Sequence, residues 1–364
     1  MEALDKRFLG LAISLSRRGL GQSWPNPAVG CILVRDGVIV GRGTTQPGGR
    51  PHAEQQALAQ AGAAAKGATA YVSLEPCAHH GKTPPCAEAL VTAGVVRVVA
   101  ALQDPDPRVN GQGFARLRAA GIEVVSGVMQ EEAADVLGGF LSRHQKGRPE
   151  ITLKLALSLD GRIATASGHS QWITGAQARR AVHALRACHD AVMVGAGTAR
   201  ADDPMLTVRG LGLGHQPGRV VVSRRLDIPL TSKLAQSAQE VPVWLCCGPD
   251  VDPALSAAWQ GLGAHVVPCR LTGRQIEMRS VVEELANIGF TRVLCEGGGA
   301  LAASLLAEDL IDEVHVFSAG LAIGAEGLPG ISALGLDHLD AARRFSLLGT
   351  RPVGDDVLHV WRAH

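Results

Sequence analysis

The chain has 364 residues, 46% hydrophobic and only 3% aromatic, and its 35 basic and 34 acidic side chains leave a formal net charge of +1. This length exceeds what one hydrophobic core usually serves, so it predicts two domains. The nearly balanced charge gives no general attraction to polyanions, and few aromatic rings are present to stack on bases, which argues against a nucleic-acid partner. Eight cysteines in this length are too sparse for a disulfide-stapled secreted domain.

The beginning of the chain opens with acidic and basic residues and lacks the apolar core of a signal peptide. No uninterrupted apolar run reaches the ~18 residues of a membrane span. We therefore expect a reduced, cytoplasmic protein without a membrane partner. Such a setting suits zinc bound by thiolates.

The first half of the chain alternates strand-like and helix-like segments. Residues 29–34 and 38–41 are apolar runs around Asp36-Gly37, which predicts a β-hairpin. Together these segments predict an α/β sandwich in a first domain of residues 1–145, and the charged residues 143–149 predict a linker. The other expected strands cover residues 70–74, 95–102 and 123–125, and the expected helices cover 4–18, 53–61, 113–120 and 131–142, with one more beginning near Cys86.

The second half, residues 150–364, restarts the alternation. Strands that alternate with helices predict a mostly parallel sheet covered on both faces. No internal repeat relates the halves, so we expect two different folds. The expected strands cover 151–157, 191–194, 219–223, 241–246, 265–268, 292–295, 313–318 and 358–362, and the expected helices cover 176–187, 276–287 and 300–307.

One imidazole, two thiols and a carboxylate form the most informative pattern. His52 and Glu54 follow Pro51, and Cys77 and Cys86 come later in the chain. A histidine and two cysteines leave the fourth tetrahedral position of Zn²⁺ open for water, and a carboxylate that is not a ligand can carry the protons. His52 and Glu54 can converge only where a helix begins, since residues two apart on a regular helix point to different faces. The pattern predicts a zinc-dependent deaminase with Glu54 as the proton shuttle.

A structural zinc site is the alternative. His79 or His80 could supply a fourth ligand, but this interpretation gives Glu54 no role. Between Cys77 and Cys86, Lys82 and Thr83 are suited to a substrate phosphate, or they form a solvated turn. Five further cysteines are expected in the core or at the surface: Cys31, Cys188, Cys246, Cys247 and Cys269.

Seven sequence blocks are spread over nearly the whole chain: residues 25–30, 78–85, 153–164, 170–174, 190–198, 202–209 and 296–299. In this order they resemble the bifunctional deaminase/reductase family of riboflavin biosynthesis. The resemblance implies a cytidine-deaminase-like three-layer sandwich followed by a domain that resembles dihydrofolate reductase. It also implies two reactions on one phosphoribosyl pyrimidine. The first hydrolyses the 2-amino group of 2,5-diamino-6-ribosylamino-4(3H)-pyrimidinone 5′-phosphate, and the second reduces the ribosyl group to ribityl with NADPH.

The resemblance further implies roles for individual residues. Lys154 is the candidate catalytic residue of the reductase. One zinc ion and one NADPH are the expected cofactors, and the family suggests a homo-oligomer. Substrate contacts are expected from Asn26, His79 and Lys82 in the first domain and from Ser170, Arg186, Leu206, Arg209 and Glu296 in the second. Cofactor contacts are expected from Ala156, Trp172, Thr198, Asp202, Ser223, Gly298, Gly299, Ala300 and Leu301.

Some of these assignments also have a physical reason. The glycines of 296–299 lie between an expected strand and helix, where the backbone can approach phosphate oxygens, although a plain tight turn is an equal alternative. The guanidinium forks of Arg186 and Arg209 match a ribose phosphate, although arginines are usually solvated or ion-paired. Ser223, with the two arginines that follow it, could hold the 2′-phosphate of NADPH.

Two positions depart from the family pattern. Thr45 stands where the family often has histidine, and Asp106 stands where it commonly has asparagine. We expect altered substrate affinity with both activities retained. Two other functions are alternatives to this prediction: a nucleoside or tRNA deaminase with an unrelated appended domain, and an inactive zinc-stabilised module.

Overall fold

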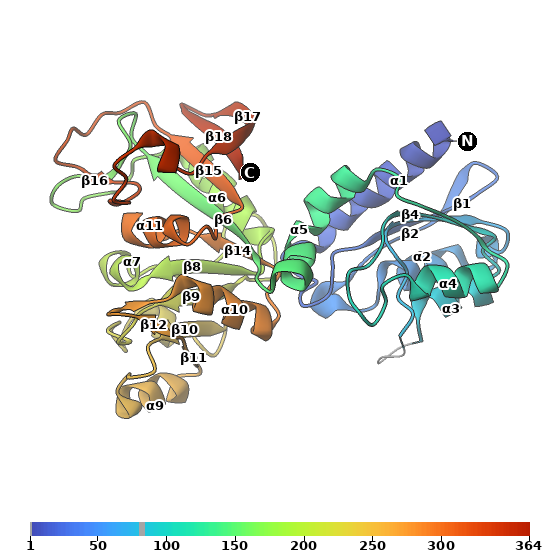
Figure 1. The fold of residues 1–364 in the computed structure, drawn as a ribbon, viewed down its shortest axis with the longest axis horizontal. Coiled ribbons are helices and arrows are strands. Elements are labelled where there is room, and N and C mark those ends of the chain that lie inside the picture. Colours follow the sequence, from blue (N-terminus) through green and yellow to red (C-terminus); the bar gives the residue numbers. More distant parts are fainter. Residues whose placement is uncertain (1, 80–83) are drawn as a thin grey trace. The chain divides into compact units, whose positions relative to one another are not determined.

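The structure is a computed structural model that describes residues 2–79 and 84–364 (Figure 1). The chain divides into two compact units, the first ending at Arg148 and the second beginning at Pro149. Helix α5 (Gln130–Lys146) continues through most of the predicted linker, and its last turn is basic. Basic side chains are favourable there because the carboxyl end of a helix is negatively polarised. The charged run therefore marks a helix end, and the linker prediction was wrong over residues 143–146.

The first unit is built on a five-stranded sheet in the order β2-β1-β3-β4-β5. Strand β1 is antiparallel to β2 and β3, whereas β3, β4 and β5 are parallel. Successive side chains point to opposite faces, so Ile32 and Val34 join one buried cluster while Cys31 and Leu33 join another. The strands are β1 (Gly30–Arg35), β2 (Val38–Thr44), β3 (Thr69–Leu74), β4 (Arg97–Leu102) and β5 (Glu123–Ser126).

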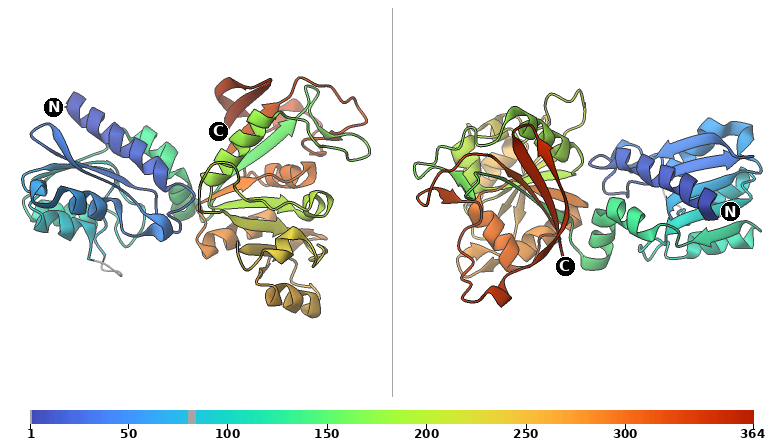
Figure 2. Two further views of the ribbon diagram at one scale, coloured as in Figure 1. Left: turned by 180° about the vertical axis from the view of Figure 1, so that it is seen from behind. Right: turned by 90° about the horizontal axis from the view of Figure 1, so that it is seen from above.

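Helices cover both faces of this sheet and produce three layers (Figure 2). Helices α1 and α5 pack on one face, and α2, α3 and α4 pack on the other. The remaining helices of this unit are α1 (Glu2–Ser16), α2 (Ala53–Ala61), α3 (Cys86–Thr92) and α4 (Gln112–Ala119), with 3₁₀ turns at Arg17–Gly19, Pro47–Gly49 and Gly62–Ala65.

Two glycines of β2 let helix α2 lie unusually close to the sheet. A Cβ atom at Gly41 would lie 2.2 Å from the carbonyl oxygen of Ala57, and one at Gly43 would lie 1.9 Å from that of Ala53. No side chain fits at either position. This contact fixes the start of α2, which carries part of the predicted zinc site.

The second unit contains a nine-stranded sheet in the order β11-β10-β9-β8-β14-β6-β15-β18-β17. The strands from β11 to β15 are parallel, and the β17–β18 hairpin adds two antiparallel strands at one edge. The strands are β6 (Glu150–Leu157), β8 (Ala191–Gly195), β9 (Gly218–Val222), β10 (Val243–Cys247), β11 (His265–Pro268), β14 (Arg292–Cys295), β15 (Glu313–Ser318), β17 (Phe345–Val353) and β18 (Asp356–Ala363). Shorter pairs are β7 (Arg162–Ala164) with β16 (Leu328–Pro329), and β12 (Leu271–Thr272) with β13 (Gln275–Ile276).

Several elements of this unit were not predicted. Strand β17 is exposed along nearly its whole length, so it has no alternating hydrophobic pattern, and only its pairing with β18 defines it. Helix α9 (Pro253–Gly261) starts with an Asp252 cap and a proline in the first turn, a signal that the sequence did contain. The other helices are α6 (Ala176–Ala187), α7 (Ala196–Asp202), α8 (Lys233–Gln236), α10 (Met278–Ile288) and α11 (Gly299–Ala307), with a 3₁₀ turn at Leu339–Ala341.

The strand order of the second unit reverses beside β6. The chain proceeds from β6 to β8 and then outward to β11, returns to β14 between β8 and β6, and continues to β15 on the other side of β6. Ligands of open parallel sheets bind beyond the carboxyl ends of the strands at such a reversal. Among the described helices of both units, none is long and apolar enough to cross a membrane.

Candidate metal centre and reductase site

The predicted zinc ligands converge in the first unit. His52 is in extended conformation directly before α2, and Cys86 is the first residue of α3. The Nδ1 atom of His52 lies 3.6 Å from Sγ of Cys77 and 3.3 Å from Sγ of Cys86. All three potential ligand atoms lie within 4.8 Å of one another. One nitrogen and two sulfurs at this spacing fit a tetrahedral zinc ion.

Within residues 2–79 and 84–364, this group contains three ligands and no fourth. His79 is not part of the group, although its Nδ1 is buried and has no hydrogen-bond partner among the residues that the structure describes. His80, the other candidate for a fourth ligand, lies outside the described residues. Three protein ligands are typical of catalytic zinc, which keeps one position for water or substrate.

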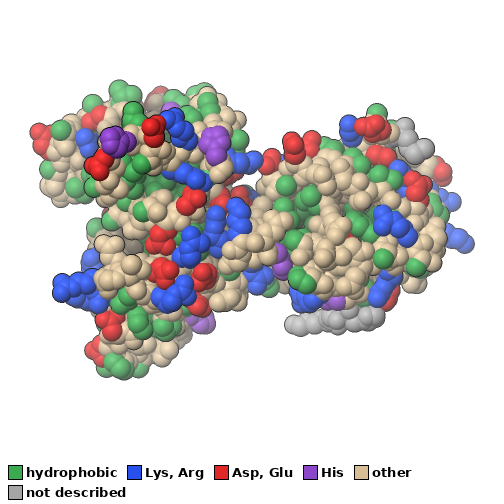
Figure 3. Space-filling view, viewed as in Figure 1, with side chains coloured by type: hydrophobic (Ala, Val, Ile, Leu, Met, Phe, Trp, Pro, Cys, Tyr) green, Lys and Arg blue, Asp and Glu red, His purple; other side chains and the backbone are tan. Residues whose placement is uncertain are grey.

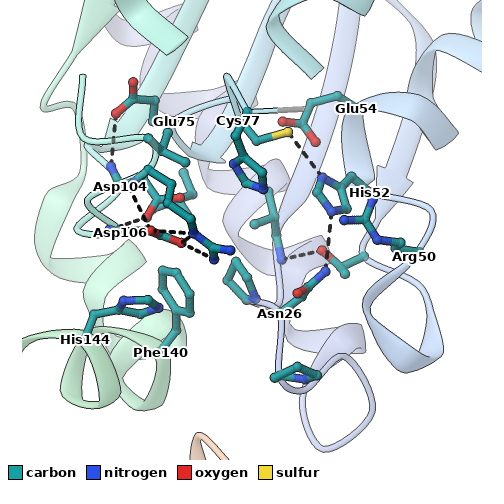
Figure 4. A pocket seen from close by; sticks show the side chains of 18 of the residues that line it. Asn26, Arg50, His52, Glu54, Glu75, Cys77, Asp104, Asp106, Phe140 and His144 are labelled. Atoms are coloured by element: carbon teal, nitrogen blue, oxygen red, sulfur yellow. Dashed lines mark hydrogen bonds and ion pairs between the residues drawn. The ribbon is translucent and has the colours of Figure 1, made fainter. Parts of the chain in front are cut away.

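Glu54 lies in the first turn of α2 and is only 3% exposed. Burial raises the pKa of its carboxyl group to about 7, because the charged form loses its hydration. A bound dication would oppose this shift by stabilising the carboxylate. Figure 4 shows Glu54 beside Cys77 and His52.

The two thiols share a proton. The side chain of Cys86 hydrogen-bonds to Cys77, and its backbone N–H also donates to Sγ of Cys77 at 3.3 Å. These bonds lower the pKa of Cys77 to about 4, whereas the same pairing raises the pKa of Cys86. Zinc binding would displace the protons that the two sulfurs carry.

A cavity of about 300 Å³ opens beside the metal ligands. Figure 4 shows His52 and Cys77 on one side and Asp104, Asp106, Phe140 and His144 on the other. Burial raises the pKa of Asp104 to about 7. Sequence reasoning missed Asp104 as a cavity residue, and also Glu75 and Arg108, which line the same space.

The predicted substrate contacts of this unit lie at the cavity where the structure describes them. Asn26 and His79 both line it, whereas Lys82 lies outside the described residues. The side-chain amide of Asn26 donates to the carbonyl oxygen of Gly49 at 2.9 Å and lies 3.4 Å from Nε2 of His52. Asn26 therefore adjoins the metal-binding imidazole.

In the second unit, Lys154, Arg186 and Glu296 form a charged group. Lys154 is half-buried on β6, and Glu296 follows β14, the neighbouring strand. Nε and one terminal nitrogen of Arg186 contact the two carboxylate oxygens of Glu296 at 2.6 and 2.9 Å. Burial lowers the pKa of Lys154, and Glu296 partly opposes this. Burial alone would raise the pKa of Glu296, but Arg186 holds it below its usual range.

This pairing differs from what we expected for Arg186. Its guanidinium also donates to the carbonyl oxygen of Thr207 at 2.9 Å, so most of its hydrogen-bonding capacity is used within the protein. The Arg209 side chain is exposed, and its backbone N–H donates to Nδ1 of His183 at 3.2 Å. Of the two arginines, Arg209 is the more accessible to a phosphate.

The predicted cofactor residues at the carboxyl edge of the sheet surround the start of α11. The backbone N–H of Gly298 donates to Oγ1 of Thr198 in α7 at 3.2 Å. A Cβ atom at Gly299 would lie 2.6 Å from the carbonyl oxygen of Pro329, so glycine is required there. The first turn of a helix leaves N–H groups without intrahelical partners, and these suit the phosphates of a dinucleotide. Residues 298–301 therefore remain the predicted contacts for the phosphates of NADPH.

The other predicted residues of this unit are more scattered. The Ser223 hydroxyl is buried and donates to Asp227 at 2.8 Å. Leu206 is buried with a positive φ of 55°, and Asp202 is exposed at the end of α7. Ser170 and Trp172 lie between β7 and α6, with the Trp172 side chain 66% exposed. Ala156 is half-buried near the end of β6.

Comparisons with known proteins bear on both units. Residues 149–359 match the family model described as the RibD C-terminal domain, and residues 2–102 match that of the cytidine and deoxycytidylate deaminase zinc-binding region. The chain is 41% identical to the riboflavin biosynthesis protein RibD of Escherichia coli, over 98% of this chain and 99% of that one. The chain belongs to the RibD family.

Solved structures of RibD proteins agree with this assignment along the whole chain. Acinetobacter baumannii RibD is 38% identical and superposes with a TM-score of 0.90 over 100% of this chain and 99% of that one. A deaminase/reductase of Thermotoga maritima is 32% identical, with a TM-score of 0.87 over 100% and 99% of the two chains. The predicted fold class is confirmed: a cytidine-deaminase-like domain precedes a RibD reductase domain.

As a RibD protein, the chain is a bifunctional deaminase and reductase of riboflavin biosynthesis, with a zinc-binding deaminase domain and an NADPH-dependent reductase domain. A deaminase with an unrelated appended domain is not favoured. The structure also shows what the two departures do. The Thr45 hydroxyl accepts a hydrogen bond from the backbone of Val29 at 3.0 Å, so it anchors the loop that carries Asn26. Asp106 is paired with Arg108.

Proposed function

We propose that the chain catalyses two successive reactions on one phosphoribosyl pyrimidine. The first domain would remove the 2-amino group of 2,5-diamino-6-ribosylamino-4(3H)-pyrimidinone 5′-phosphate as ammonia. The second would reduce the ribosyl group of the product to ribityl and give 5-amino-6-(5-phosphoribitylamino)uracil. The convergence of His52, Cys77 and Cys86 beside buried Glu54 is the observation that carries the proposal. The name of the Thermotoga relative, a diaminohydroxyphosphoribosylaminopyrimidine deaminase and 5-amino-6-(5-phosphoribosylamino)uracil reductase, supports it.

In the deaminase step, His52, Cys77 and Cys86 would hold the zinc ion, which acidifies a bound water. Glu54 would take a proton from that water and pass it to the departing amino group, so that the carbon gains oxygen and loses ammonia. A carboxylate suits this exchange when its pKa lies near the working pH. Asn26 would orient the His52 ring and His79 would contact the substrate, since both line the cavity.

In the reductase step, NADPH held at residues 298–301 would supply the hydride that reduces C1′ of the ribosyl group. The bond between C1′ and the ring oxygen breaks, and that oxygen needs a proton. Lys154 is our candidate donor because its pKa is lowered by burial, which makes the ammonium a better acid. Glu296, held by Arg186, would orient the sugar hydroxyls, and Arg209 would bind the phosphate. Ser170 and Leu206 complete the proposed substrate contacts.

The proposed NADPH site follows the carboxyl edge of the sheet. Residues 298–301 would bind its phosphates through backbone N–H groups. Ser223 would lie near the 2′-phosphate. The remaining proposed contacts are Ala156, Trp172, Thr198 and Asp202.

A single assay tests the two reactions and their order. Purified, zinc-replete protein is given the diaminopyrimidine ribosyl phosphate with and without NADPH, and ammonia and NADPH are followed. We expect ammonia in both conditions and NADPH oxidation only after deamination begins. Ammonia without NADPH oxidation would contradict the reductase assignment, and no ammonia would contradict the deaminase assignment.

We also propose that the protein is a cytoplasmic homo-oligomer. A thiolate zinc site requires reduced cysteines, and all eight cysteines are unpaired in the structure. Light scattering on the purified protein would test the oligomer, because a monomeric mass at micromolar concentration contradicts it.

A further inference from the structure

The end of the deaminase cavity away from the metal ligands carries acidic side chains, although the proposed substrate carries a phosphate. Glu75 turns toward the backbone, accepting N–H groups of Asp104 at 3.1 Å, Gly111 at 2.9 Å and Phe114 at 3.1 Å. Asp104 accepts the N–H of Asp106 at 2.8 Å. Phosphate binding in this cavity therefore needs a cation that offsets the remaining carboxylate, Asp106.

Arginines that line the cavity are Arg50, Arg108 and Arg143, and Arg108 is paired with Asp106. The Nε atom of Arg108 lies 3.0 Å from both carboxylate oxygens of Asp106, and one terminal nitrogen lies 2.5 Å from Oδ2. The Arg108 backbone N–H also donates to Oδ1 of Asp106 at 2.9 Å. Asp106 is only 8% exposed and Arg108 is 69% exposed at their side chains. A buried carboxylate thus holds an accessible guanidinium in one orientation.

The pairing uses only one edge of the guanidinium. The other terminal nitrogen of Arg108 makes no hydrogen bond or ion pair within residues 2–79 and 84–364. Arg108 lines the same cavity as His52 and Cys77. A guanidinium edge with free N–H groups matches two phosphate oxygens, and the fixed orientation reduces the entropy lost on binding.

We propose that Arg108, oriented by Asp106, binds the 5′-phosphate of the deaminase substrate. Asp106 acts as a positioning residue, and the guanidinium of Arg108 offsets its negative charge. This inference rests on the proposed function, because it takes the phosphoribosyl pyrimidine as the substrate.

The test compares ammonia release from the phosphorylated substrate and from its dephosphorylated ribosyl analogue. The variants are Arg108→Gln, Arg108→Lys and Asp106→Asn. Arg35→Gln is the matched control, since Arg35 also pairs with a nearby aspartate, 3.6 Å away in the turn between β1 and β2. The quantity measured is the ratio of kcat/KM for the two substrates.

In Arg108→Gln we expect this ratio to fall about tenfold or more, through a higher KM for the phosphorylated substrate, because a charge-assisted hydrogen bond is lost. Arg108→Lys should restore part of the ratio by keeping the charge. Asp106→Asn should lower it less, because the guanidinium remains but is no longer held. Arg35→Gln should match the wild type.

An unchanged ratio in Arg108→Gln would overturn the proposal. Equal losses on both substrates would also overturn it, because they would show that the pair only stabilises its turn. A wild type that releases no ammonia from either substrate would instead overturn the proposed function.

Discussion

At the scale of single residues, the two sites depend on charged side chains that are withdrawn from water. Glu54 is nearly fully buried beside the three candidate metal ligands, and Lys154 is half-buried near an ion pair. Burial raises the pKa of the acid and lowers that of the base, because each loses hydration of its charged form. Both groups are thereby moved toward proton exchange near neutral pH.

The role proposed for Glu54 can be separated from zinc binding. In Glu54→Gln we expect kcat for ammonia release to fall at least about a hundredfold, because proton transfer is lost. Zinc content should stay near one per chain, since Glu54 is not among the converging ligand atoms. Ammonia assays and atomic absorption provide the two measurements, and Glu131→Gln on the exposed start of α5 is the control. A variant that keeps deaminating would show that another group carries the proton.

His189 provides a residue-scale prediction for stability. Its Nδ1 lies 2.7 Å from the Leu185 carbonyl oxygen and its Nε2 lies 3.0 Å from the Thr152 hydroxyl. Burial lowers its pKa from 6.5 to about 3, so the folded state holds the neutral ring. Between these two pKa values the imidazole is protonated in the unfolded chain but neutral in the folded state. The free energy of unfolding therefore falls as the pH decreases below 6.5.

This difference in protonation lowers the free energy of unfolding by about 2 kcal/mol at pH 5 relative to pH 7. Thermal unfolding of the wild type and of His189→Gln at both pH values measures it. We expect the free energy of unfolding to fall more in the wild type than in the variant when the pH is lowered from 7 to 5. This comparison holds even if the variant is less stable than the wild type at pH 7. Parallel losses in the two proteins would mean that His189 is not held neutral.

At the scale of elements, helix starts place the reactive groups. His52 precedes α2, Cys86 begins α3, and Gly299 begins α11. A helix start exposes N–H groups and a positive dipole end, which favour thiolates and phosphates. Two of these starts, those of α2 and α11, lie in close contacts that only glycine permits. Gly43 is the clearest case, because its missing side chain lets α2 contact β2.

Gly43→Ala should therefore disturb the metal site from a distance. The added Cβ atom would lie 1.9 Å from the Ala53 carbonyl oxygen, so α2 must shift. We expect a loss of about 1–3 kcal/mol in stability, as for other overpacked cores, and weaker zinc binding in competition with a chelator. Gly10→Ala in α1 is the control, because its Cβ would meet only Met129 at 3.6 Å. Unchanged zinc affinity in Gly43→Ala would contradict this account.

At the scale of the whole molecule, each compact unit contains its own core and its own candidate site. The metal ligands and cavity lie before Arg148, and Lys154, Glu296 and residues 298–301 lie after it. On the face shown in Figure 3, basic and acidic side chains are interspersed over both units, as expected from the balanced composition. Each unit therefore contains the residues of its own proposed site.

Single-site variants should separate the two activities. Lys154→Met, which keeps side-chain length without charge, should release ammonia at the wild-type rate and oxidise little NADPH. Glu54→Gln should oxidise NADPH only when supplied with the deaminated intermediate. Coupled assays of ammonia and NADPH measure both. Loss of both activities in either variant would contradict independent sites and point to misfolding.

The sequence by itself determined the kinds of groups and their local context. His52, Glu54, Cys77 and Cys86 were identified because zinc chemistry demands these residue types, and α11 because a strand, glycines and a helix pattern follow one another. Only the tertiary structure decided the pairings: Arg186 with Glu296, Arg108 with Asp106, and β17 with β18. Packing between elements determines these partners. The hydrophobic periodicity of a segment does not show which strand will pair with it, and the type of a charged residue does not show which opposite charge will lie beside it.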